Sequence, residues 1–146
     1  MEKVVEVVRI KQIVVEREEY LKNSIKSPKD AAKLVMNEIG DEDREVFLVL
    51  VLNVKNQVNA IYRCHVGSIN ASIVHPREVM KVAILNNGAS IIVGHNHPSQ
   101  NLEASPEDIE VTKRLVEAGQ LMGIELLDHV IVSENNFNSL KEKGYL

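Results

Sequence analysis

The sequence predicts an α/β fold: a three-layer-like sandwich in which a mixed β-sheet is flanked by helices. Runs of valine, isoleucine and leucine recur along the chain at strand length. Between them lie segments that open with serine or proline and close with glycine or asparagine, as helices do. Linkers, repeats and low-complexity tracts are absent from the sequence, so its 146 residues are expected to form a single domain.

A valine-rich segment at the start of the chain is predicted to be a strand. Val4 to Val15 is read as one long or bent strand, because β-branched residues fill most of its positions. It belongs to an N-terminal strand extension, residues 1–26, ahead of a core that covers residues 27–146. As an exposed edge, this strand could pair with a second copy and form a homodimer.

The core is expected to alternate helices and strands. Proline suits the first helical position because its missing N–H would have no partner there, and glycine or asparagine suits the end of a helix. In chain order, the predicted elements are a helix from Ser27-Pro28 to about Ile39 that ends at Gly40, a buried strand at Val46–Leu52, a turn at Asn53–Gln57, a return strand from Val58 to about Val66, a helix from Pro76 to the stop at Asn86-Asn87-Gly88, a strand at Ala89–Gly94, a helix that begins after Ser105, a last core strand at Ile124–Val132 and a short terminal helix at Asn138–Lys143.

Two histidines follow the strand at Ala89–Gly94 directly. His95 and His97 are one residue apart, and in extended backbone they point to the same side because the side-chain period of a strand is two. Asn96 must point the other way. Both imidazoles can therefore reach one metal ion, at the distance of about 2.0–2.1 Å that zinc requires.

Asp108 is expected to complete this metal site. It lies in the first turn of a helix whose start is marked by the N-cap residue Ser105 and by Pro106. On a helical wheel Asp108 falls within the apolar stripe, among Val111, Leu115, Val116, Ala118 and Met122. An inward carboxylate is costly unless it is paired or bound to metal. The alternative is a capping-box role at N3. Two histidines and one aspartate leave a fourth position for water, as in a catalytic zinc site.

A hydrolytic site would also need a general base. Zinc lowers the pKa of its bound water to about 7, and hydrolysis then needs a carboxylate to take and return a proton. Glu45 stands at the start of the buried strand Val46–Leu52, in phase with its inward side chains. The residues alone do not separate Glu45 from Glu42, Asp43 or Glu103. Another alternative is that Glu45 is a solvated residue between a helix and a strand.

The metal motif resembles that of a known family. His95-x-His97, seven residues, Ser105, two residues and Asp108 are similar to the JAMM motif of MPN+ metalloproteases, which include deubiquitinating isopeptidases. From about Ser27 to the C-terminus, four further motifs resemble the RadC branch: Val74-His75-Pro76-Arg77-Glu78-Val79, Gly94-His95-Asn96-His97-Pro98-Ser99, Thr112-x-x-Leu115-Val116-Glu117-Ala118-Gly119 and Leu127-Asp128-His129.

The chain departs from the RadC pattern in two places. Gln100 stands where the family usually has glycine, which bears on the conformation of a loop but on no metal ligand. Longer RadC proteins also carry an N-terminal helix-hairpin-helix module, for which this chain has no room.

The resemblance implies the MPN architecture and a zinc-dependent hydrolase that cleaves a peptide or isopeptide bond. It implies Zn²⁺ bound by His95, His97 and Asp108. It also implies Glu45 as the catalytic base, because Arg44-Glu45-Val46-Phe47 matches the strand that the family's catalytic glutamate opens. Ser105 would stabilise the oxyanion, whereas the residues alone predict only a helix cap.

Two other functions remain open. One is a DNA-repair or mobile-element accessory protein, in which the metal site is structural or binds the chain end of a partner. The other is metal-dependent phosphodiester cleavage. The net charge of −4, with lysine and arginine scattered among acidic residues, does not favour a nucleic-acid partner. A peptide or protein substrate is therefore expected.

Composition also bears on location. No signal peptide is visible, and the longest apolar stretch, Val46–Leu52, is too short to span a bilayer. The protein is expected to be cytoplasmic, without a membrane partner. A single cysteine, Cys64, excludes an internal disulfide and any cysteine-based zinc site, and it is expected to be a small core residue.

The remaining candidates are given smaller roles. His65, His75 and His129 lie in or beside predicted strands and are expected to be structural. Asp128-His129 could also orient a ligand imidazole, as zinc histidines usually require. Gly67-Ser68-Ile69-Asn70 could border the substrate groove, because it lies between a strand and a helix.

Overall fold

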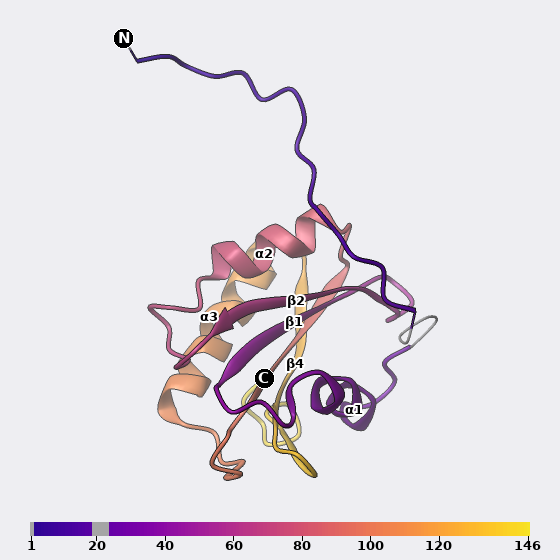
Figure 1. Cartoon of the computed structure of the whole chain (residues 1–146), viewed down its shortest axis with the longest axis vertical. Coiled ribbons are helices and arrows are strands. Elements are labelled where there is room, and N and C mark those ends of the chain that lie inside the picture. The colour runs from indigo at the N-terminus through magenta and orange to yellow at the C-terminus, as the bar shows by residue number, and fades with distance from the viewer. Residues whose placement is uncertain (1, 19–23) are drawn as a thin grey trace.

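The structure is a computed structural model that describes residues 2–18 and 24–146 (Figure 1). Its elements, in chain order, are α1 (Pro28–Ile39), β1 (Val46–Leu52), β2 (Val58–Val66), α2 (Pro76–Leu85), β3 (Ser90–Asn96), α3 (Pro106–Met122), β4 (Glu125–Val132) and β5 (Phe137–Ser139). Within the described ranges, no helix is long and apolar enough to cross a membrane. The expected cytoplasmic location stays a prediction.

The strands form one mixed sheet in the order β2-β1-β3-β4-β5. β1 runs antiparallel to both β2 and β3, β3 is parallel to β4, and β4 is antiparallel to β5. Every residue of the inner strands β1 and β3 is buried, as expected for strands covered on both faces. The predicted mixed sheet is confirmed.

Helices cover both faces of this sheet, so the predicted sandwich is also confirmed (Figure 1). Alternate residues of β1 belong to two separate apolar clusters. Leu48 and Leu50 pack with α1 on one face, whereas Phe47 and Val49 pack with α2 and α3 on the other. The metal motif therefore emerges between two filled layers, which restrict how its side chains can move.

The helix and turn signals act locally as predicted. Ser27 Oγ accepts a hydrogen bond from Asp30 N at the start of α1, and Ser105 Oγ accepts one from Asp108 N at the start of α3. In the β1–β2 turn, Asn53 Oδ1 accepts hydrogen bonds from two backbone amides, which closes the predicted hairpin. These contacts satisfy backbone N–H groups that have no hydrogen-bond partner within the helix or strand itself.

β3 extends further than predicted. The strand was expected to end at Gly94, but it includes His95 and Asn96. His95 lies opposite Phe47 of β1 and Ile131 of β4, so hydrogen-bonded neighbours on both sides hold this backbone extended. His97 N continues the pattern by donating to Val132 O at 3.0 Å. The extended geometry assumed for the two histidines is therefore present.

The prediction of an N-terminal strand is wrong. Val4–Val15 forms no strand in the structure, and its valine and isoleucine side chains are 67% to 101% exposed. A high β-propensity does not form a strand without a neighbouring backbone and a surface to pack against. Part of the predicted extension, residues 19–23, lies outside the described residues.

The prediction of a terminal helix at Asn138–Lys143 is also wrong. Phe137–Ser139 forms β5 and pairs with β4, and a turn follows at residues 140–144. The buried Asp128 carboxylate holds this segment, because it accepts hydrogen bonds from Ser139 Oγ at 2.6 Å and Lys141 N at 3.1 Å. Pairing with the sheet edge outweighs the local helical preference of the segment.

Candidate metal centre

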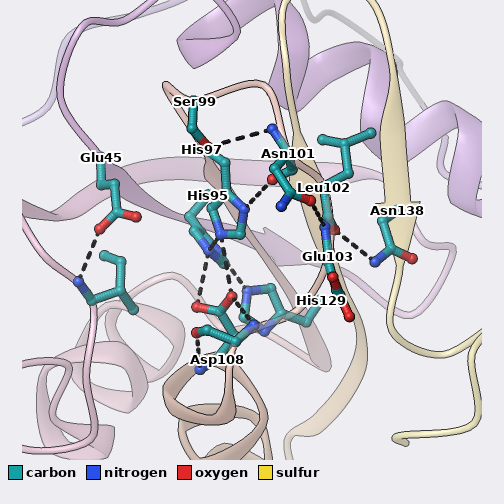
Figure 2. Close-up of polar contacts among 12 residues, drawn as sticks. Glu45, His95, His97, Ser99, Asn101, Leu102, Glu103, Asp108, His129 and Asn138 are labelled. Atoms are coloured by element: carbon teal, nitrogen blue, oxygen red, sulfur yellow. Dashed lines mark hydrogen bonds and ion pairs between the residues drawn. The ribbon is translucent and has the colours of Figure 1, made fainter.

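The end of β3 and the start of α3 bring His95, His97 and Asp108 together (Figure 2). Their ligand atoms all lie within 4.8 Å of one another. His95 Nε2 is 3.1 Å from Asp108 Oδ1, His97 Nε2 is 3.2 Å from Asp108 Oδ2, and the two Nε2 atoms are 2.9 Å apart. His95 and Asp108 are buried, whereas the side chain of His97 is 12% exposed, so the group is reached from the side of His97.

These separations fit a small cation with tetrahedral ligands. Two ligands that are each about 2.0–2.1 Å from a tetrahedral ion are about 3.3 Å apart. The three observed separations are 2.9, 3.1 and 3.2 Å. The His-His-Asp group can therefore hold a metal ion after only a small adjustment of its side chains.

A chain of buried hydrogen bonds places a proton on Nδ1 of His95. Thr112 Oγ1 donates to the backbone carbonyl of Asp108 at 2.7 Å, so it must accept from the Nδ1–H of His129, 2.7 Å away. Burial lowers the pKa of His129 well below its usual value, so this ring is neutral and its Nε2 is an acceptor. His95 Nδ1, 2.8 Å from that atom, must donate to it.

His97 is held in the same way by a different partner. Its Nδ1 lies 2.6 Å from the carbonyl oxygen of Asn101, which can only accept, so Nδ1 carries the proton. In their neutral forms, His95 and His97 thus both turn an Nε2 lone pair toward the Asp108 carboxylate (Figure 2). Two converging lone pairs and a carboxylate repel one another unless a metal ion or a proton lies between them. A metal histidine whose other nitrogen donates to a fixed acceptor is the usual arrangement in proteins.

Asp108 has both of the roles considered for it. Its Oδ2 accepts a hydrogen bond from Ser105 N at 2.9 Å, which completes a capping box, while both of its oxygens face the histidines. Burial raises the pKa of Asp108, but the hydrogen bonds with His95 and His97 outweigh it and hold the pKa far below its usual range. The same contact with Asp108 raises the pKa of His97 despite burial. The site therefore favours positive charge beside an ionised carboxylate.

Asn96 points away from the metal group, as predicted, and ties down the segment that carries Glu45. Its Oδ1 accepts from Val46 N at 2.7 Å, and its Nδ2 donates to Glu42 O at 3.2 Å and Arg44 O at 3.0 Å. One buried side chain thus binds backbone groups on both sides of Glu45. The position of that glutamate is linked to β3, the strand that bears the histidines.

Glu45 lies beside the metal group. Its negative charge contributes to raising the pKa of His97, and its Oε2 accepts a hydrogen bond from Ile69 N at 3.2 Å. Gly67 N also donates to the backbone oxygen of Glu45 at 2.7 Å. The Gly67–Asn70 segment therefore lies against Glu45. The Glu45 side chain is therefore bound to the backbone of Ile69, whereas the alternative interpretation expected it to be a solvated residue between a helix and a strand.

The other candidate bases are placed differently. The Glu42 carboxylate pairs with Arg63 at 3.2 Å, and Asp43 is exposed. Glu103 is exposed and lies on the opposite side of the histidine pair from Glu45 (Figure 2). Of the four carboxylates, Glu45 is the one whose negative charge raises the pKa of His97.

Ser105 caps α3 and stands next to Asp108 in the capping box. Its Oγ accepts from Asp108 N at 3.0 Å, a bond that uses an oxygen lone pair and leaves the hydroxyl proton available to donate. The predicted cap is confirmed. Its suggested role at an oxyanion stays a prediction.

Two buried residues, His129 and Thr112, orient the His95 imidazole, a role that the sequence indicated only weakly. His129, expected above all to be structural, is fully buried and contacts His95 directly, which fits the alternative that Asp128-His129 orients a ligand imidazole. From the sequence alone, Thr112 belongs to a family motif and has no predicted role. Its position four residues after Asp108 places it on the same face of α3, and this spacing could have revealed it.

The fold and site together define an α/β sandwich domain with a candidate two-histidine, one-aspartate metal centre between a strand end and a helix start. Residues 25–145 match the model of a protein family that is described as the RadC-like JAB domain. The chain therefore belongs to the RadC-like JAB domain family, as the motifs predicted.

Similar proteins carry a name that states no activity. The chain is 52% identical over 122 residues to a UPF0758 protein of Desulforamulus reducens, 54% over 122 residues to one of Caldanaerobacter subterraneus subsp. tengcongensis, and 55% over 123 residues to one of Bacillus cereus. Each match covers 84% of this chain but only 54%, 52% and 55% of the relative. The chain thus spans about half the length of the curated relatives it matches.

Proposed function

We propose that the chain is a zinc-dependent hydrolase of the JAMM type that cleaves a peptide or isopeptide bond. One observation carries the proposal: the Nε2 atoms of His95 and His97 converge on Asp108 while a fixed acceptor binds each Nδ1 proton. Nitrogen and oxygen ligands in this number suit zinc and leave a coordination position open on the exposed side. Membership of the JAB family supports the same reading.

In this proposal, each residue at the centre has a separate task. Zinc would act as a Lewis acid and lower the pKa of a bound water to about 7. Glu45, held by Ile69 N beside His97, would take a proton from the attacking water and return it to the leaving amine. Ser105 would donate its hydroxyl proton to the developing oxyanion while its oxygen remains the cap of α3.

A peptide or protein is the substrate class we propose. The chain has a net charge of −4, whereas binding to a nucleic-acid backbone depends on neutralising phosphates with lysine and arginine. The hydrolysis that we propose requires a water molecule, a general base and an oxyanion donor, and the site has a candidate for the last two. Amide hydrolysis needs no second metal ion.

The test uses the zinc-loaded full chain and a peptide library that includes isopeptide-linked lysines, with cleavage followed by mass spectrometry. We expect cleavage that a chelator abolishes and that zinc restores. Glu45→Gln should keep stoichiometric zinc and lose turnover by at least about a hundredfold. Glu42→Gln, which alters a carboxylate paired with Arg63, is the matched control and should keep its rate.

Two results would contradict the proposal. A full hydrolytic rate for Glu45→Gln would show that the base is wrong, although the metal site could stand. Absence of bound zinc in the wild type, or zinc content unchanged by His97→Ala, would show that the metal site itself is wrong. Salt-dependent DNA binding without peptide cleavage would instead support an accessory role in DNA repair.

A further inference from the structure

The side chain of Asn138 in β5 carries a buried polar atom that nothing satisfies. Its Nδ2 donates to the backbone oxygen of Leu102 at 2.9 Å. Its Oδ1 is buried and, among the residues that the structure describes, has no hydrogen-bond partner. A buried polar atom without a partner is destabilising, and leucine, which has a similar size, would avoid that cost. Such an exception calls for an explanation, and the group that Nδ2 holds supplies one.

The Leu102 carbonyl belongs to the segment that connects His97 to Ser105. Within this segment, the backbone oxygen of Asn101 lies 2.6 Å from Nδ1 of His97 and accepts its proton. Leu102 follows Asn101 directly, so the Asn138 hydrogen bond fixes the peptide next to the one that orients the imidazole (Figure 2). A side chain of β5 is thereby linked to a candidate metal ligand on β3.

The contacts within this segment do not fix its position relative to the sheet. Asn101 Oδ1 accepts from Glu103 N at 3.0 Å, and Asn101 N donates to Ser99 Oγ at 3.4 Å. Both contacts join residues of the segment to each other, and all three residues are exposed. An exposed loop opens locally at a small cost in free energy. The place of the Asn101 carbonyl therefore depends on contacts with the rest of the fold.

Two side-chain hydrogen bonds connect the segment to the chain that follows β4. One is the bond from Asn138 to Leu102. The other runs from Glu134 N to Oε1 of Gln100 at 3.3 Å. Gln100 has a φ of 69°, which residues other than glycine rarely adopt. Since β4 pairs with β3 and β5 pairs with β4, these bonds hold the segment against the strands that carry the histidines.

We propose that Asn138 is a positioning residue for the metal centre. By holding the Leu102 carbonyl, it keeps the adjacent Asn101 carbonyl against Nδ1 of His97, so that the proton stays on Nδ1 and Nε2 remains free to bind the metal. Asn138 acts through the backbone and is not itself a ligand. The inference rests on the proposed metal centre but not on the proposed cleavage of peptides.

The first test compares zinc affinity with stability. Asn138→Leu removes the donor to Leu102 and also the unpartnered oxygen, so we expect zinc affinity to fall by about tenfold or more while the urea midpoint stays unchanged or rises. Competition with a chromogenic chelator measures the affinity of the full chain. Asn135→Leu is the matched control, because the exposed Asn135 side chain makes no hydrogen bond among the described residues. Asn138→Ala adds no bulk and should lose zinc affinity even if leucine fits poorly.

The second test needs no metal. Ring-nitrogen NMR of the metal-free full chain, under alkaline conditions in which the rings are neutral, reports which nitrogen carries the proton. We expect the Nδ1–H form of His97 in the wild type and a larger share of the Nε2–H form in Asn138→Leu. The His95 ring, which His129 holds, is the internal control and should not change.

Two outcomes would overturn the inference. One is a folded Asn138→Leu variant with wild-type zinc affinity and the wild-type form of the His97 ring. The other is a loss of affinity that only accompanies a loss of stability, with the His97 ring unchanged, since this would indicate a merely structural role. A wild type that binds no zinc would show that the proposed metal centre is wrong, whereas the NMR comparison would still decide whether Asn138 positions His97.

Discussion

His129 Nε2 lies 2.8 Å from His95 Nδ1, and both rings are fully buried. The contact links β4 to β3 beneath the candidate metal centre. Phe47 packs against both rings, with its ring centroid 6.3 Å from that of His95 and 5.8 Å from that of His129. The His95 imidazole is therefore fixed by one hydrogen bond and by packing before any metal is bound.

The first prediction concerns His129. His129→Leu removes the acceptor for the His95 Nδ1 proton, so we expect metal affinity to fall by about 10–100-fold. His129→Gln can supply a carbonyl oxygen to the same proton and should retain more affinity than His129→Leu. Competition with a chromogenic chelator measures both, and thermal melting followed by circular dichroism checks that each variant is folded. Equal affinities for wild type and His129→Leu would contradict a positioning role.

The second prediction separates the two roles of Asp108. Asp108→Asn keeps an oxygen that can accept from Ser105 N, whereas Asp108→Ala loses it. In metal-free protein, the free energy of unfolding of Asp108→Ala should therefore be about 1 kcal/mol lower than that of Asp108→Asn. Both variants should lose metal, because neither supplies a charged ligand. Urea denaturation measures the stability, and elemental analysis measures the metal. His75→Ala is a control, since His75 makes no side-chain capping bond at α2.

The third prediction concerns Asn96. Asn96→Ala would leave the buried Val46 amide and the Glu42 and Arg44 carbonyls without this partner. We expect a loss of about 2–4 kcal/mol in the free energy of unfolding, since each unsatisfied buried group costs about 1–3 kcal/mol and water can reach some of them. Chemical denaturation provides the value. A loss below 0.5 kcal/mol would mean that the Glu45 segment is held by other contacts.

The fourth prediction concerns Cys64 and pH. Burial and the negative charge of Glu78 raise the pKa of the Cys64 thiol to about 11, although Lys81 acts in the opposite direction. A raised pKa leaves less thiolate at a given pH, so at pH 8 only about one thiol in a thousand is ionised. Labelling by a disulfide reagent should be slow and should accelerate about tenfold per pH unit between pH 8 and pH 10. Urea-unfolded protein is the control and should react quickly; equal rates for folded and unfolded protein would be inconsistent with the burial of Cys64.

Local sequence signals predicted most of the fold. Prolines after Ser27 and Ser105 marked helix starts, and Asn53 and Gln57 marked a hairpin, because each acts through contacts with residues only a few positions away. The spacing of His95 and His97 also suffices, since alternation along a strand is a local property. The group that can hold a metal was predictable for this reason.

Other features depended on partners that are distant in the sequence. The helix predicted at Asn138–Lys143 is instead β5 and a turn, because the free edge of β4 and the buried Asp128 bind that segment. The strand predicted at Val4–Val15 has no neighbouring strand among residues 2–18 and 24–146, which the structure describes. In both cases the local preference was real, but a strand is completed only by another backbone.

The sequence by itself determined the element order, the apolar faces of the sheet and the three side chains that can converge on a metal, because these follow from periodicity and spacing. Only the tertiary structure decided which carboxylate lies beside His97 and which buried groups fix the histidines. Glu45, Thr112 and His129 come from three separate elements or their ends, and packing of the sheet against α3 brings them to one place. That convergence depends on distances across the fold, which no local pattern encodes.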